Sequence, residues 1–262
     1  MRIVVVGDIH VQPDKLWRML REAGLADEHN RPTDELRDGG TRLVLLGDLV
    51  HAKSRQRYAD LINVRRYDEY NPRHLERAEE AQVRFLREVK GFQERVPSGN
   101  MIILLGNHDF NAATPDQGPL RTDDVSHLEW KPGYGSELDS ELRDWILAWP
   151  AEAGIEGLHF AHVGPLPEHN TYDQSFYVEN RRRWLQEDRD YLEGTPYTLG
   201  VYGHTPVRGG VNVASQGRAL LLDTNGYKDE YTWLEIDVRN ADYRLRLHGL
   251  FFDELVPRQQ LD

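Results

Sequence analysis

The chain has 262 residues, a formal net charge of −12 and no cysteine. This length allows one large α/β domain, and the absence of cysteine excludes disulfides, thiolate metal sites and cysteine catalysis. The acidic balance makes broad binding to nucleic-acid backbones unfavourable. No apolar run is long enough to cross a bilayer and no signal peptide precedes the first strand, so we expect a cytoplasmic protein without a membrane partner.

Apolar strands and amphipathic helices alternate in the first part of the chain. Residues 3–6 form the first predicted strand, and Pro13 to Gly24 form a helix with proline in its first turn and glycine after its end. The second predicted strand covers residues 42–46. A helical period predicts a long helix from His74 to Val96.

After a third predicted apolar strand at Met101–Leu105, the composition and periodicity of the sequence change. Residues 110–136 carry several prolines and glycines and show little periodicity. A segment of this length in a compact enzyme is either a lid or substrate wall, or a surface excursion, and the residues alone leave both open.

Strands dominate the last third of the chain. Two helices are also predicted in the second half of the chain. Because the sequence shows no internal repeat or linker, we expect a single domain over residues 1–262. The helices are predicted at Asp139–Trp149 and Arg181–Leu192, and the strands at 158–161, 198–202, 219–223, 231–238 and 243–251.

Glycine followed by a metal-binding type of side chain ends the first three strands. The blocks are Gly7-Asp8-Ile9-His10, Gly47-Asp48 and Gly106-Asn107-His108-Asp109, and later strands lead to His162 and to Gly203-His204-Thr205-Pro206. Parallel strands place such residues together at their carboxyl ends. Oxygen and imidazole donors without thiolates favour Mn, Fe or Zn over Ca, so we expect a binuclear metal site.

These five blocks, in this order, resemble the metallophosphoesterase (calcineurin-like) superfamily, whose pattern is D-x-H, G-D, G-N-H-[DE], H, G-H. The resemblance implies an α/β fold, an αββα sandwich of two mixed sheets flanked by helices. Taken singly, Asp8 and Asp48 could be helix caps, Asn107 a turn residue, and His162 or His204 a packed histidine. The order of the blocks favours the metal reading.

The resemblance also implies a division of the ligands between two divalent ions. Asp48 would bridge them, and a hydroxide held between the ions would be the nucleophile. The first ion would take Asp8, His10 and Asp48, and the second Asp48, Asn107, His162 and His204.

His108 is expected to be the general acid that protonates the leaving oxygen, or to bind a phosphoryl oxygen. In the protein-phosphatase pattern an Asp orients this histidine and a nearby Arg binds phosphate. Here His51 and Ala52 stand at those two positions, so the pattern is incomplete. Asp109 is an alternative partner for His108.

Two further stretches point to different branches of the superfamily. Gly203-His204-Thr205-Pro206 and Leu221–Gly226 resemble phage-type phosphatases and symmetrical diadenosine tetraphosphatases, as does Glu179–Arg183, which makes Arg181 and Arg183 candidates for gripping phosphate. By contrast, Asp48–Arg55 resembles the D-L-F-H-x-S-R of repair nucleases, which makes His51 and Arg55 candidate substrate residues, with Arg57 also near. Pro206 cannot ligate and the net charge is acidic, and both points oppose a nuclease.

The sequence therefore predicts a dinuclear-metal phosphomonoesterase of the phosphoprotein-phosphatase-like branch, with two divalent ions, manganese first and iron or zinc as alternatives. Its partner would be a phosphorylated small molecule, nucleotide or phosphoprotein. The alternatives are a dinucleoside polyphosphate hydrolase, a cyclic-nucleotide phosphodiesterase or a DNA-repair-type nuclease.

Overall fold

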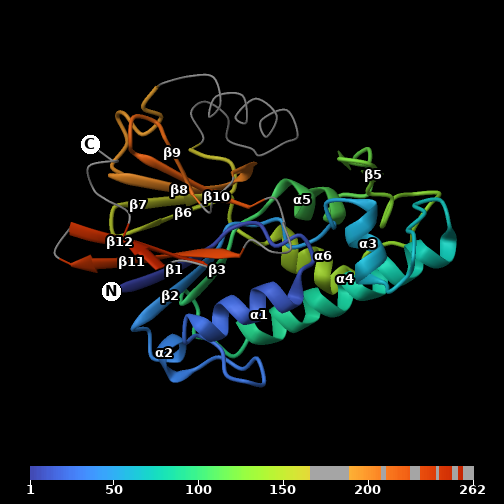
Figure 1. The fold of residues 1–262 in the computed structure, drawn as a ribbon, viewed down its shortest axis with the longest axis horizontal. Helices are drawn as coiled ribbons and strands as arrows, with labels where there is room; N and C mark the ends of the chain where they lie inside the picture. The colour runs from blue at the N-terminus through green and yellow to red at the C-terminus, as the bar shows by residue number, and fades with distance from the viewer. Residues whose placement is uncertain (166–188, 208–210, 225–230, 240–241, 250–252, 256–262) are drawn as a thin grey trace.

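The computed structural model describes residues 1–165, 189–207, 211–224, 231–239 and 242–249, and the backbone of 253–255. Helices and strands alternate up to β3, and strands predominate after residue 150 (Figure 1). The helices are α1 (Pro13–Glu22), α2 (Asp34–Arg37), α3 (Arg55–Leu61), α4 (Pro72–Gln93), α5 (Asn107–Ala113) and α6 (Ser140–Leu147). The strands are β1 (Arg2–Val6), β2 (Thr41–Leu45), β3 (Met101–Ile103), β4 (Arg121–Thr122), β5 (Val125–Ser126), β6 (Glu152–Ile155), β7 (Leu158–Ala161), β8 (Leu199–Pro206), β9 (Asn212–Ala214), β10 (Ala219–Asp223), β11 (Thr232–Arg239), β12 (Asp242–Gly249) and β13 (Asp253–Leu255).

Two mixed sheets form the centre of the molecule. The six-stranded sheet has the order β13-β12-β11-β1-β2-β3, and the five-stranded sheet has the order β6-β7-β8-β10-β9. Parallel pairing joins β1, β2 and β3 in the first sheet and β7, β8 and β10 in the second. The carboxyl ends of these parallel strands therefore offer two adjoining edges for a site.

The alternation of side chains along β1 shows how the layers are built. Val4 and Val6 pack into the cluster that contains the helices, whereas Ile3 and Val5 pack into the cluster between the sheets. Successive side chains of a strand point to opposite faces, so a strand that is buried on both faces is apolar throughout. The second cluster also contains Phe160 and Val201 of the five-stranded sheet, which shows that the sheets pack face to face.

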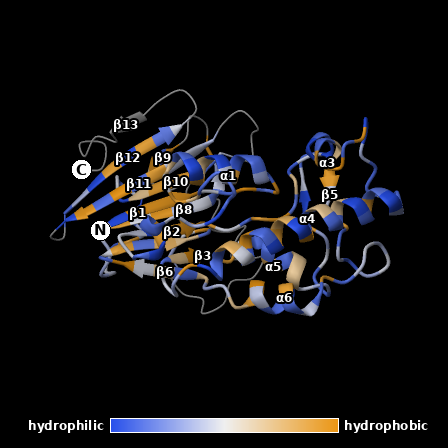
Figure 2. Cartoon of the chain, turned by 90° about the horizontal axis from the view of Figure 1, so that it is seen from below, coloured by the Kyte–Doolittle hydropathy of each residue, from blue (hydrophilic) through white to orange (hydrophobic). Residues whose placement is uncertain are grey.

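The helices α1, α4 and α6 cover the outer face of the six-stranded sheet, with α1 and α4 lying along it (Figures 1 and 2). Their apolar side chains, among them Trp17, Phe85, Phe92 and Ile146, join one buried cluster. Among the described residues, no helix is both long and apolar enough to span a membrane. The prediction of mixed sheets flanked by helices is confirmed, while most of the helix predicted at 181–192 lies outside the residues described.

Residues 110–136 contain more structure than the sequence indicated. The short helix α5 extends into this range, and β4 and β5 form a small hairpin that lies beside α3 in both views (Figures 1 and 2). The backbone N–H of Arg55 donates to Asp124, which fastens the hairpin region to the start of α3. The sequence did not reveal these elements because α5 and the two strands of the hairpin are too short to show a period, and prolines and glycines surround them.

Candidate metal centre

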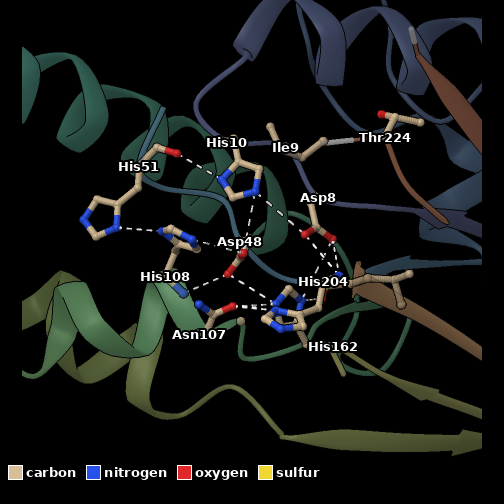
Figure 3. A network of polar contacts seen from close by, with 12 residues as sticks. Asp8, Ile9, His10, Asp48, His51, Asn107, His108, His162, His204 and Thr224 are labelled. Atoms are coloured by element: carbon tan, nitrogen blue, oxygen red, sulfur yellow. Dashed lines mark hydrogen bonds and ion pairs between the residues drawn. The ribbon is translucent and has the colours of Figure 1, made fainter. Parts of the chain in front are cut away.

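The buried site lies where strand ends of both sheets meet (Figure 3). Asp8 and His10 follow β1, Asp48 follows β2, and Asn107 begins α5 after β3. His162 follows β7 and His204 lies in β8, so the second sheet supplies the remaining imidazoles. The structure thus brings together all six predicted metal-binding residues.

Close approach of the backbones explains the glycines that precede these residues. A Cβ on Gly47 would lie 2.7 Å from the backbone nitrogen of Gly106, and Gly47 has a φ of 97°. A Cβ on Gly203 would collide with the carboxylate of Asp8. Any larger residue at these two positions would push the donor groups apart, so glycine is required for packing as well as for conformation.

Backbone strain is concentrated at the same place. His10, Asp48, His51 and His204 all adopt positive φ values, of 47°, 53°, 62° and 59°. This region is unfavourable for non-glycine residues, and such strain persists where surrounding contacts hold it and where a site needs a particular geometry.

One group of donors is formed by Asp8, His10 and Asp48. His10 Nε2 lies 3.7 Å from Asp8 Oδ2 and 3.6 Å from Asp48 Oδ2. Both His10 Nε2 and Asp48 Oδ2 are buried and have no hydrogen-bond partner among the residues that the structure describes. Donors held about 2.1 Å from one ion at roughly right angles would lie about 3 Å apart, so a small closure would fit a divalent cation here.

The imidazole of His10 is oriented for this purpose. Its Nδ1 lies 3.0 Å from the carbonyl oxygen of His51, to which an Nδ1–H donates, and this leaves the lone pair of Nε2 facing the carboxylates. A backbone acceptor behind a histidine is the arrangement that fixes the tautomer of a metal ligand.

A second group of donors lies on the other side of Asp48. His162 Nε2 is 3.4 Å from Asp48 Oδ1 and 3.1 Å from Asn107 Oδ1, and His204 Nδ1 is 2.9 Å from the same Asn107 oxygen. His162 Nδ1 lies 2.7 Å from the carbonyl of Leu46, so its Nε2 faces the site. The two oxygens of Asp48 therefore face different groups of donors, as a bridging carboxylate requires.

Sequence reasoning missed Asp223 as a member of the first group. Donor atoms of Asp8, His10 and Asp223 lie within 4.8 Å of one another, and Asp223 is fully buried. It pairs in register with Pro206 of β8, two residues after His204. The sequence contained a signal for this residue, because Asp223 stands at the end of an apolar strand, much as Asp8 and Asp48 stand just after apolar strands.

The electrostatics of the first group also favour a cation. Burial and the neighbouring Asp223 carboxylate raise the pKa of Asp8 well above its usual value. Burying several groups of like charge raises the free energy of the folded state unless the charges are paired or coordinate a metal. The donor chemistry and the orphaned atoms therefore fit divalent metal ions.

A family model described as calcineurin-like phosphoesterase matches residues 1–243. The chain belongs to this family. No curated protein matches this phosphoesterase significantly. Among solved structures, a cold-active protein tyrosine phosphatase aligns with a TM-score of 0.62 and 16% identity, covering 100% of this chain and 80% of the other. A protein serine/threonine phosphatase from Saccharomyces cerevisiae aligns with a TM-score of 0.50 and 12% identity, covering 95% of this chain and 79% of the other. At these identities the two likenesses show a shared fold.

The partner of His108 in this phosphoesterase is His51. Their Nδ1 atoms lie 3.1 Å apart, and both imidazoles are buried. Asp109, the predicted alternative, is bonded elsewhere: its carboxylate accepts N–H groups from Leu49, Val50 and Gly106. Adjacent residues at the start of a helix point in different directions, so Asp109 ties the two ligand loops together instead of orienting His108.

Residues 110–136 contribute a wall beside these histidines. The ring of His127 stacks on His51, with centroids 4.3 Å apart and planes 6° apart. His127 is itself held by Tyr58 and Thr122, at 2.9 Å and 2.8 Å. Burial, followed by the positive charge of Lys53, lowers the pKa of His127 to about 3, so this imidazole is neutral. These contacts pack part of the segment against the buried histidines, and its role as a lid or substrate wall stays a prediction.

Lys53 is a second residue that sequence reasoning missed. Apart from burial, its charge is the largest cause that lowers the pKa of His10, and it acts on Asp8 and His108 as well. Its side chain makes no hydrogen bond or ion pair with any residue that the structure describes. Lys53 thus places an available positive charge near the centre.

Of the arginines predicted to bind phosphate, Arg55 is engaged by a carboxylate outside the group of metal-binding candidates. The guanidinium of Arg55 lies 3.3 Å from Glu69, which engages it away from the ligands. Arg181 and Arg183 lie outside the described residues.

Proposed function

We propose that this phosphoesterase is a dinuclear-metal phosphomonoesterase. The observation that carries the proposal is the position of Asp48, whose two oxygens face two separate groups of buried donors. A carboxylate placed in this way can hold a pair of cations roughly 3.5–4 Å apart.

The first ion would be held by Asp8, His10 and Asp48, with Asp223 as a further ligand. The second would be held by Asp48 together with Asn107, His162 and His204. Two divalent ions, manganese before iron or zinc, would supply Lewis-acid stabilisation of the phosphoryl oxygens and an activated water. The protein's own contribution is to fix these donors in a water-poor setting, where charge–charge effects are strong.

His108 is the residue that we expect to act on the leaving group. It adjoins the ligand Asn107, and its backbone N–H donates to Asp48 at 2.9 Å, which anchors the start of α5 on the bridging carboxylate. We assign to His108 the protonation of the leaving oxygen and to His51 the orientation of its ring. Lys53 would attract the phosphoryl group in place of the arginine that this sequence lacks, while Arg181 and Arg183 remain predicted contributors.

The substrate class that we propose is a phosphorylated small molecule, nucleotide or phosphoprotein, acted on in the cytoplasm by a single domain spanning residues 1–262. A phosphodiesterase is the second candidate. His51 favours it, because a second histidine beside His108 resembles the repair-nuclease pattern at this position.

A substrate panel would test the proposal. The purified protein, loaded with Mn²⁺, should hydrolyse p-nitrophenyl phosphate faster than bis-p-nitrophenyl phosphate, and should leave linear duplex DNA intact. Diadenosine tetraphosphate and a phosphopeptide complete the panel. Faster hydrolysis of the diester would promote the phosphodiesterase, and full activity after chelation of metals would refute a metal-dependent reaction.

A further inference from the structure

A cavity of about 430 Å³ is lined on one side by His10, and neither His162 nor His204 is among its lining residues. It is bounded by the start of α1, by the C-terminal half of α3 and by Tyr231. Small-molecule sites in proteins usually measure about 300–1,000 Å³, so the space suits one small organic group. Since His10 lines both the cavity and the metal centre, a group in the cavity could belong to a substrate whose phosphate lies at that centre.

Three cationic side chains, Lys15, Arg18 and Arg57, line this cavity in a chain that is acidic overall, and Arg18 is paired with Glu22. The guanidinium of Arg57 has no hydrogen bond or ion pair with the residues that the structure describes. Lys15 is buried and its Nζ lies 3.2 Å from Thr224 Oγ1. A free guanidinium is the side chain best suited to grip a phosphate with two parallel hydrogen bonds.

The rest of the lining is unsuited to a long polyanion. Tyr231 and Leu61 give apolar surface, and the ring of Tyr231 is held by Arg18 at 4.5 Å from its centroid. Asp14 and Asp60 also line the cavity and would repel further phosphates. Carboxylates do, however, accept hydrogen bonds from hydroxyl and amino groups.

We propose that this cavity is the leaving-group subsite of the enzyme and that it takes a nucleoside monophosphate moiety. In this arrangement one phosphate binds the guanidinium of Arg57, and the planar base packs against Tyr231 and Leu61. Sugar hydroxyls or a base amine donate hydrogen bonds to the carboxylates of Asp14 and Asp60. This inference rests on the proposed function, because it makes the substrate a nucleotide ester or anhydride whose scissile phosphoryl group lies at the metal centre.

Product-type inhibition gives the first test. AMP should inhibit hydrolysis of p-nitrophenyl phosphate by the Mn-loaded protein with a Ki at least about tenfold below that of orthophosphate, because its base and sugar make contacts in the cavity that orthophosphate cannot make. Ribose 5-phosphate should fall between the two. Equal Ki values for AMP and orthophosphate would overturn the subsite.

Variants of Arg57 give the second test. Arg57→Ala should raise the Ki of AMP about tenfold or more, which is the loss expected for a charge-assisted hydrogen bond, and Arg57→Lys should restore part of it. Arg84→Ala, at an exposed position on α4, is the matched control and should change nothing. If Arg57→Ala raises the Ki of orthophosphate as much as the Ki of AMP, Arg57 binds the scissile phosphoryl group and the subsite is refuted.

A third measurement separates this inference from the function itself. Titration calorimetry of AMP with the Mn-loaded protein does not require turnover, and Leu61→Asp, which adds a carboxylate to the cavity wall, should weaken AMP binding by about tenfold without removing a cation. AMP binding that depends on Arg57 and Leu61 in a protein that hydrolyses no ester would keep the subsite and reject the phosphatase. Hydrolysis without preferential AMP binding would reject the subsite alone.

Discussion

His51 connects His10, a predicted metal ligand, to the expected general acid, because its carbonyl oxygen lies 3.0 Å from His10 Nδ1 and its own Nδ1 lies 3.1 Å from His108 Nδ1. Its backbone N–H in turn donates to Gln82 at 2.8 Å, and His127 stacks on its ring. The residue that replaces the usual aspartate is therefore held on three sides. A neutral imidazole can hold the ring of His108 in place by one hydrogen bond, although it cannot supply the negative charge of a carboxylate.

Removal of this contact gives the first prediction. His51→Ala should lower kcat by about tenfold and leave KM nearly unchanged, since one hydrogen bond of about 1–1.5 kcal/mol is lost. The double variant with His108→Ala should be no slower than His108→Ala alone, because His51 acts through His108. Additive losses in steady-state kinetics would instead show that His51 contacts the substrate itself.

His108→Ala gives the second prediction. Metal content should stay at the wild-type value, while kcat for a poor leaving group such as an alkyl phosphate should fall by about 10²–10⁴-fold. The loss should be much smaller for p-nitrophenyl phosphate, whose leaving group needs little protonation. His29→Ala, at an exposed position, is the control. An equal loss for both esters would assign His108 to binding of the phosphoryl group.

The metal content of Asp48 variants gives the third prediction. The wild-type protein should hold two divalent ions per chain, as measured by elemental analysis after gel filtration, and Asp48→Ala should hold neither tightly, since both groups of donors depend on this carboxylate. Turnover should fall to background. Asp38→Asn, which changes an exposed carboxylate, should retain both ions. Two ions bound to Asp48→Ala would contradict a bridging role.

The parts of the fold and site that follow from the sequence are the local ones. Strand, glycine and ligand stand next to one another along the chain, so the carboxyl-end positions of Asp8, Asp48 and Asn107 could be predicted before the topology was known. The amphipathic period of α4 and the apolar run of β1 likewise depend on neighbouring residues alone.

What the sequence did not show depends on contacts between distant segments. His51 stacks on His127, which lies 76 positions further along the chain, and no sequence pattern at either position predicts this contact. Asp109 adjoins His108 in sequence but bonds to the loop after β2, because helix geometry turns neighbouring side chains apart. The short helix α5 has too few residues to show a period beside the glycine and prolines around it.

Glu129 gives the last prediction, which concerns stability and pH. This carboxyl is fully buried in the wall segment, where Gln82 Nε2 lies 3.3 Å from its Oε1, and burial raises its pKa to about 7. Because the pKa in the folded state exceeds the unfolded value, the stabilising contribution is complete below the unfolded pKa and is lost as pH rises through about 7. Between about pH 5 and about pH 8 the wild-type free energy of unfolding should therefore fall relative to that of Glu129→Gln, by up to about 3 kcal/mol. Urea unfolding at a series of pH values measures this difference, with Glu80→Gln at an exposed position of α4 as the control. Parallel pH profiles for the wild type and Glu129→Gln would show that Glu129 is already ionised in the folded protein, stabilised by its hydrogen bonds despite burial.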